Sequence, residues 1–97
     1  MNRAQVREAR AIALRLYLHT RRANIGYRSS MQILGMNWPH ERFEFNYILG
    51  RIVELDAEAG ITEARKTACR WVVRQTGPHA GTPGIGYIGK TQMEGIV

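Results

Sequence analysis

The last third of the chain constrains the fold most, because two apolar runs there flank a turn-rich segment. Residues 67–74 read TACRWVVR, which is rich in β-branched and aromatic side chains, and residues 85–88 read IGYI. Residues 75–84 between them contain Gly and Pro in combinations typical of turns. Two such runs around a turn predict a β-hairpin. Because side chains alternate along a strand, we expect Trp71 on its inward face.

The residues before this segment are predicted to be helical. Residues 2–22 contain no Gly or Pro, and their apolar side chains recur at steps of three and four, which predicts a first helix. Its expected buried stripe is Val6, Ala9, Ala13, Leu16 and Tyr17, widened by Ile12 and Leu14.

Two further helices are expected before the hairpin. A short one runs from residue 30 to 34 or 36, with Ser29 or Ser30 as its cap and Gly35 as its left-handed end. A long one spans residues 39–59, with Pro39 in its first turn and Gly60 after its end. The expected core residues of these two helices are Met31, Ile33, Leu34, Met36, Phe45, Ile48, Leu49, Ile52, Leu55 and Ala59.

Charge is high and unevenly distributed. The 97 residues carry a formal net charge of +6, and 12 of the 14 cationic residues are Arg. Residues 1–38 hold seven Arg against one Glu, residues 39–60 hold two Arg against five acidic residues, and residues 61–97 hold five cations against two Glu. Arg forms forked contacts with phosphate, guanine and carboxylate, so the bias favours a binding role, although a genome rich in G and C also favours Arg codons.

The length predicts one domain over residues 1–90, followed by a tail at 91–97. Cys69 is the single cysteine, which excludes a disulfide or a cysteine-based zinc site within one chain. The three His residues do not have metal-ligand spacing, and no Ser has an evident base partner. We therefore predict neither an enzyme nor a cofactor. In the absence of an apolar run long enough for a signal peptide or a membrane span, we expect a cytoplasmic protein.

Several short motifs resemble winged helix-turn-helix modules of bacterial and phage proteins, over residues 10–88. They are Ile25-Gly26-Tyr27, Ile33-Leu34-Gly35, Leu49-Gly50-Arg51-Ile52 with Gly60, Val72-Val73, Thr76-Gly77 and Pro83-Gly84-Ile85-Gly86-Tyr87. The resemblance implies an α+β fold of three helices with a C-terminal β-hairpin wing, and a small strand near residues 24–27 that pairs with the hairpin. It also implies that the third helix enters the major groove of DNA while the wing reaches the minor groove or phosphates.

One hypothesis is therefore a small basic protein that binds DNA or RNA, as a regulator or accessory factor of a phage or other mobile element. Arg contacts with phosphate would supply most of the affinity. The expected contact residues are Arg3, Arg7, Arg10, Arg15, Arg21, Arg22 and Arg28 from the N-terminal part, His40, Arg42 and Asn46 from the third helix, and Arg74 and His79 from the hairpin.

The alternative hypothesis is an adaptor or inhibitor that binds an acidic protein surface, such as that of a host nuclease or defence complex. The third helix is acidic, and the expected wing is lengthened by His79-Ala80-Gly81. Both departures from the resemblance favour this alternative. The arginines that share one face of the first helix are equally compatible with a solvated surface.

Overall fold

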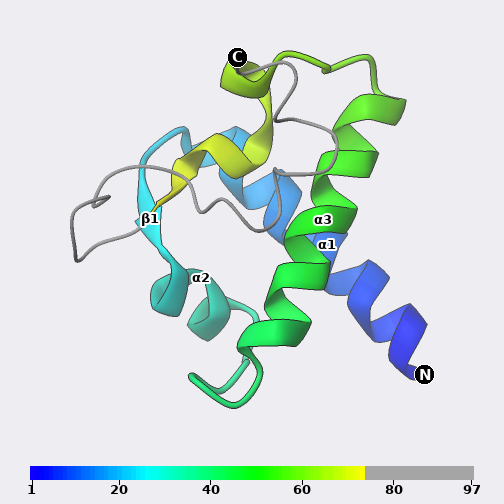
Figure 1. Ribbon diagram of the computed structural model, residues 1–97, viewed down its shortest axis with the longest axis vertical. Helices are drawn as coiled ribbons and strands as arrows, with labels where there is room; N and C mark the ends of the chain where they lie inside the picture. Colours follow the sequence, from blue (N-terminus) through cyan, green and yellow to red (C-terminus); the bar gives the residue numbers. More distant parts are fainter. Residues whose placement is uncertain (74–97) are drawn as a thin grey trace.

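The first helix begins at a well-formed cap. The computed structural model describes residues 1–73, and α1 spans Arg3–Arg21 (Figure 1). Asn2 and Gln5 form a reciprocal capping box: the Gln5 N–H donates to Asn2 Oδ1 at 2.8 Å, and the Asn2 N–H donates to Gln5 Oε1 at 3.0 Å. At the other end Arg22 adopts a left-handed conformation, with φ at 53°. The predicted first helix is confirmed.

The second helix begins earlier than predicted. The short strand β1 (Ile25–Gly26) leads directly into α2, which spans Tyr27–Ile33. Ser30 does not cap this helix. Its buried hydroxyl donates to the carbonyl of Gly26, the residue before the helix, at 2.9 Å. Gly35 has a φ of +71°, so its predicted left-handed conformation is confirmed.

The third helix, α3, spans Arg42–Glu58, within the predicted range. Pro39 lies in the turn before the helix and not in its first helical turn. Two hydrogen bonds close this turn: the Asn37 N–H donates to the Glu41 carboxylate, and the Glu41 N–H donates to the Asn37 carbonyl. Gly60 has a φ of +85°, as expected after a helix end.

The predicted winged helix is wrong. Residues 67–71 do not form a strand: after a 3₁₀ turn η1 (Ala64–Lys66), a second 3₁₀ turn η2 covers Ala68–Trp71. Only Val72–Val73 form a strand, β2, and it pairs with β1 in parallel, Ile25 opposite Val72 and Gly26 opposite Val73. A wing requires an antiparallel hairpin, whereas the described residues form three helices and one parallel pair.

Burial explains why this segment is not an alternating strand. Ala68, Cys69, Val72 and Val73 are all buried, so the apolar side chains do not follow a two-residue period. The expected inward Trp71 is half-buried and packs against the edge of the core. The expected return strand at residues 85–88 lies outside the described residues.

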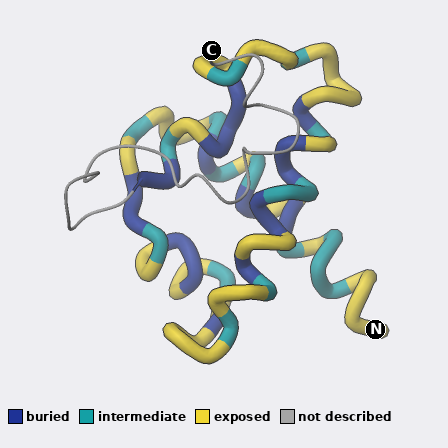
Figure 2. The backbone as a smooth tube through the Cα atoms, viewed as in Figure 1, coloured by how far each residue is buried: buried dark blue, intermediate teal, exposed yellow. Residues whose placement is uncertain are grey.

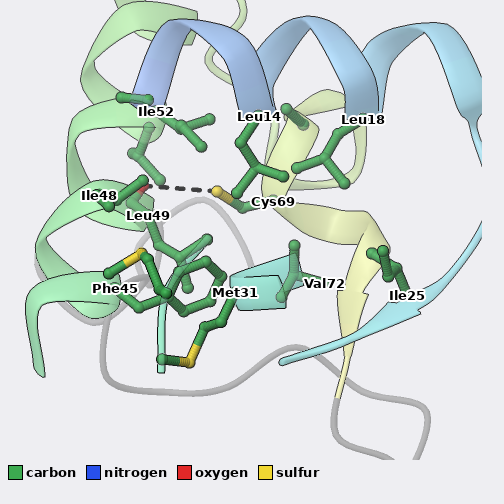
Figure 3. Packing of buried hydrophobic residues seen from close by; sticks show 14 residues of the cluster. Leu14, Leu18, Ile25, Met31, Phe45, Ile48, Leu49, Ile52, Cys69 and Val72 are labelled. Atoms are coloured by element: carbon green, nitrogen blue, oxygen red, sulfur yellow. Dashed lines mark hydrogen bonds between the residues drawn. The ribbon is translucent and has the colours of Figure 1, made fainter. Parts of the chain in front are cut away.

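One core joins the three helices and η2 (Figure 2). From α3 it takes Phe45, Ile48, Leu49 and Ile52, as predicted, while Leu55 is half-buried and Ala59 is exposed. Figure 3 shows Ile48, Leu49 and Ile52 of α3 opposite Leu14 and Leu18 of α1, with Cys69 between them. The Cys69 Sγ lies 3.5 Å from the Leu49 carbonyl oxygen, which it contacts as a weak donor.

The predicted buried stripe of α1 is wrong in part. Ala11, Leu14 and Leu18 are buried, whereas Ala9, Ala13 and Leu16 are exposed. The buried positions are three and four residues apart, as expected for one face of a helix. The helix is therefore rotated relative to the prediction, and the side that it turns to α3 also carries Arg7, Arg15 and His19, which contact carboxylates of α3.

Candidate functional site

Two ion pairs cross between α1 and α3 near the start and middle of α3. Arg7 donates from Nε and Nη2 to the two carboxylate oxygens of Glu44, at 2.7 and 2.8 Å. Arg51 donates in the same forked geometry to Glu8, at 2.7 and 3.0 Å. These hydrogen bonds lower the pKa of Glu44 and of Glu8 below their ordinary values, because they stabilise the charged carboxylates.

The third link between α1 and α3 is a fully buried carboxylate, Asp56. Its Oδ1 accepts from Arg15 Nε at 2.7 Å and lies 2.8 Å from His19 Nε2. Its Oδ2 accepts the buried backbone N–H of Ala68 at 2.7 Å, and its own carbonyl accepts the Ile61 N–H at 2.8 Å. Asp56 thus ties α1, α3 and η2 together. The sequence analysis did not identify it, because an Asp in an acidic stretch is usually exposed.

The predicted contact arginines fall into two groups. Arg7 and Arg15 are held in the interhelical pairs above, so their main role in the isolated chain is structural. The others in the described part, Arg3, Arg10, Arg21, Arg22, Arg28 and Arg42, form no ion pair with a described carboxylate, and His40 and Asn46 are exposed. Arg74 and His79 lie outside the described residues.

The acidic residues of α3 do not project freely. Glu44 is bound by Arg7, and Glu54 and Glu58 each lie 3.1 Å from Arg51 Nη1. The repulsion of phosphate that an acidic helix would cause is therefore reduced by arginines of the same molecule.

Most of the unpaired arginines lie over aromatic rings. The distances from the guanidinium carbon Cζ to the ring centroid are 5.7 Å for Arg21 and Tyr17, 5.1 Å for Arg28 and Trp38, 5.0 Å for Arg42 and Phe43, and 4.4 Å for Arg70 and Trp71. Arg7, although paired, also lies 4.7 Å over the ring of Tyr47. Phe43 and Tyr47 are 65% and 63% exposed, so neither ring belongs to the core.

A shallow depression of about 390 Å³ lies beside the unpaired Arg21. Arg21 donates to the Tyr17 hydroxyl at 2.9 Å within it. The depression is lined by the end of α1, β1 and α2, through Tyr17, Arg21, Asn24, Ile25, Gly26, Ser29, Gln32 and Ile33.

Over residues 1–73, no three His, Cys, Asp or Glu side chains gather in a group that could hold a metal ion. None of the helices in that range is both long and apolar enough to cross a bilayer. Comparisons with protein-family models, with curated proteins and with solved structures found no match.

Proposed function

We propose that this protein binds nucleic acid through arginines that have no carboxylate partner of their own. The observation that carries the proposal is an imbalance in pairing: in residues 1–73 the carboxylates all have partners within the molecule, whereas most of the arginines have no ion pair. All seven carboxylates of residues 1–73 are engaged by groups of the same molecule: Glu8, Glu41, Glu44, Glu54, Asp56, Glu58 and Glu63. Seven arginines in the same range are left without an ion pair: Arg3, Arg10, Arg21, Arg22, Arg28, Arg42 and Arg70.

The way these arginines are held supports phosphate as the ligand. Four of the seven place the guanidinium carbon within 5.7 Å of an aromatic ring centroid. A guanidinium that lies over a ring can still donate N–H groups to phosphate oxygens, although Arg21 already donates one of its N–H groups to the Tyr17 hydroxyl. Partial ordering by the ring also lowers the entropy lost when the side chain binds.

The experiment is fluorescence-anisotropy titration of a labelled DNA duplex across a salt series. We expect binding that weakens linearly in log salt, because each phosphate contact releases condensed counterions. Replacing Arg3 and Arg10 together with Ala should reduce the magnitude of the salt slope by about one per phosphate contact removed.

Arg65→Ala is the matched control, because Arg65 is exposed but already pairs with Glu63 at 3.1 Å. Arg65→Ala removes a positive charge, but it should change the salt slope less than replacing Arg3 or Arg10 does. Failure to bind at low salt, where a net charge of +6 favours association most, would refute the proposal.

A second candidate function is binding to an acidic protein, and a different surface favours it. Ile12 and Leu16 lie one turn apart on α1 and are 53% and 68% exposed, on the face turned away from Leu14 and Leu18. Exposed apolar pairs beside basic residues are typical of protein contacts. A protein retained from lysate by the wild type and lost with Leu16→Asp would support this function.

A further inference from the structure

The first turns of α3 expose two large aromatic rings on one face. Phe43 and Tyr47 are four residues apart, so their side chains are neighbours along the helix, and each is nearly two-thirds exposed. A guanidinium lies over each ring, Arg42 over Phe43 and Arg7 over Tyr47. Exposed apolar side chains that lie together, and not singly, are typical of contact surfaces.

The Tyr47 end of this surface is firmly positioned. Arg7 is held at both carboxylate oxygens of Glu44, which follows Phe43 on α3, while its guanidinium carbon stays 4.7 Å from the Tyr47 ring centroid. The forked ion pair fixes the plane of the guanidinium, and the guanidinium in turn limits where the ring can move. A ring held in this way loses little entropy when something stacks on it.

The surroundings are positively charged. The hydrogen bonds from Arg7 lower the pKa of Glu44, and the charges of Arg3 and Arg10 lower it further, which places both arginines near the pair. Arg3, Arg7 and Arg10 are also spaced to share one side of α1. Together with Arg42 they supply four positive charges, against the carboxylates of Glu44 and of the sequence neighbours Glu8 and Glu41, of which Glu8 is paired with Arg51.

We propose that this arginine–aromatic face, made of Arg3, Arg7, Arg10, Arg42, Phe43 and Tyr47, binds single-stranded nucleic acid by stacking unpaired bases on its two rings. The proposal rests on the function proposed above and specifies its substrate. A basic surface tracks the phosphates, while exposed rings accept bases of any sequence because every base has a π face. In a duplex the bases are already stacked on one another, so the two rings would contribute little.

The test compares three labelled ligands of equal length at one low salt concentration: oligo(dT), an abasic strand with the same phosphates, and a duplex. Oligo(dT) should bind more tightly than the abasic strand. Phe43→Ala and Tyr47→Ala should each weaken oligo(dT) binding about tenfold and leave abasic binding unchanged, because only the stacking contact is lost. Tyr47→Phe, which keeps the ring, should bind like the wild type.

Ile33→Ala is the control for the loss of an exposed apolar side chain elsewhere, because Ile33 of α2 is 47% exposed, and this variant should bind all three ligands like the wild type. Circular dichroism of each variant establishes that the fold is retained. Equal binding of oligo(dT) and the abasic strand by the wild type, or equal weakening of both by Phe43→Ala and Tyr47→Ala, would overturn the stacking proposal and leave nucleic-acid binding standing. No binding to any ligand would overturn both.

Discussion

Removing the carboxylate of Asp56 should destabilise the protein more than any other single change to an acidic residue of the described part. Asp56→Ala deletes three side-chain contacts at once: those with Arg15, His19 and the backbone N–H of Ala68. The first two hold α1 against α3, and the third holds η2. The substitution therefore loosens three elements around one buried point.

The magnitude follows from what the change leaves behind. Asp56 is fully buried, and so is Ala68, so the Ala68 N–H loses its acceptor where water cannot replace it. An unsatisfied buried donor costs about 1–3 kcal/mol. Removing one partner of a buried ion pair costs about 3–5 kcal/mol. Because Arg15 is 29% exposed and can partly regain water, we expect a total near the lower end of the second range, about 3 kcal/mol.

That loss is large against the whole free energy of unfolding, which for a domain of this size is about 5–15 kcal/mol. Asp56→Asn should cost less, because its amide oxygen can still accept from Ala68, although its NH2 group can no longer accept from Arg15. Glu54→Ala is the matched control on the same helix. Its carboxylate is 65% exposed, and its loss should change stability by no more than about 0.5 kcal/mol.

The assay is urea unfolding at neutral pH, followed by circular dichroism of the helices and by tryptophan fluorescence. A double-mutant cycle compares the unfolding free energies of Arg15→Ala, Asp56→Ala and the double variant. The double variant should lose less stability than the sum of the two single losses. A loss below about 1 kcal/mol for Asp56→Ala, or additivity in the cycle, would refute the argument that Asp56 is a buried link.

Three further predictions follow from the same packing. Leu14→Ala should lower the free energy of unfolding in urea by about 2–5 kcal/mol, because Leu14 is fully buried. Leu16→Ala should change it by no more than about 0.5 kcal/mol, because Leu16 is 68% exposed. Equal losses would mean that α1 turns a different face to the core. The pKa of Glu44 in the folded protein is depressed below 4.5, so its pair with Arg7 stabilises the fold above that pH, and this stability is lost as the pH falls through the folded pKa. Glu44→Gln should therefore flatten the acid side of the profile of stability against pH, measured by urea midpoints. An unchanged profile would contradict this. Burial raises the pKa of the Cys69 thiol, so alkylation monitored by mass should be slow in the folded protein and rapid in urea, and rapid labelling without urea would contradict the burial.

Local patterns in the sequence were sufficient to predict α1 and α3, whereas α2 begins three residues before its predicted start. The run without Gly or Pro predicted α1, and Gly35 and Gly60 marked two helix ends, because the left-handed conformation after a helix favours Gly whatever the rest of the molecule does. The apolar residues of α3 were also predictable, since their spacing matches one helix face. For the candidate site, the sequence identified the arginines as a group but not which of them would be free.

That distinction depends on contacts between residues far apart in the chain. Asp56 lies 41 residues from Arg15, and the α1 face that reaches it is rotated away from the apolar stripe that periodicity predicted.

The same holds for the C-terminal part of the described chain. Residues 67–73 have the β-branched and aromatic composition of a strand, but the buried link from Asp56 to Ala68 and the burial of consecutive apolar residues favour a 3₁₀ turn and a parallel pair with β1. By itself the sequence determined where helices form and how much positive charge the chain carries, because caps, glycines and charges act locally. Only the tertiary structure decided which arginines are neutralised and which rings are exposed, because both depend on which faces α1 and α3 turn toward each other.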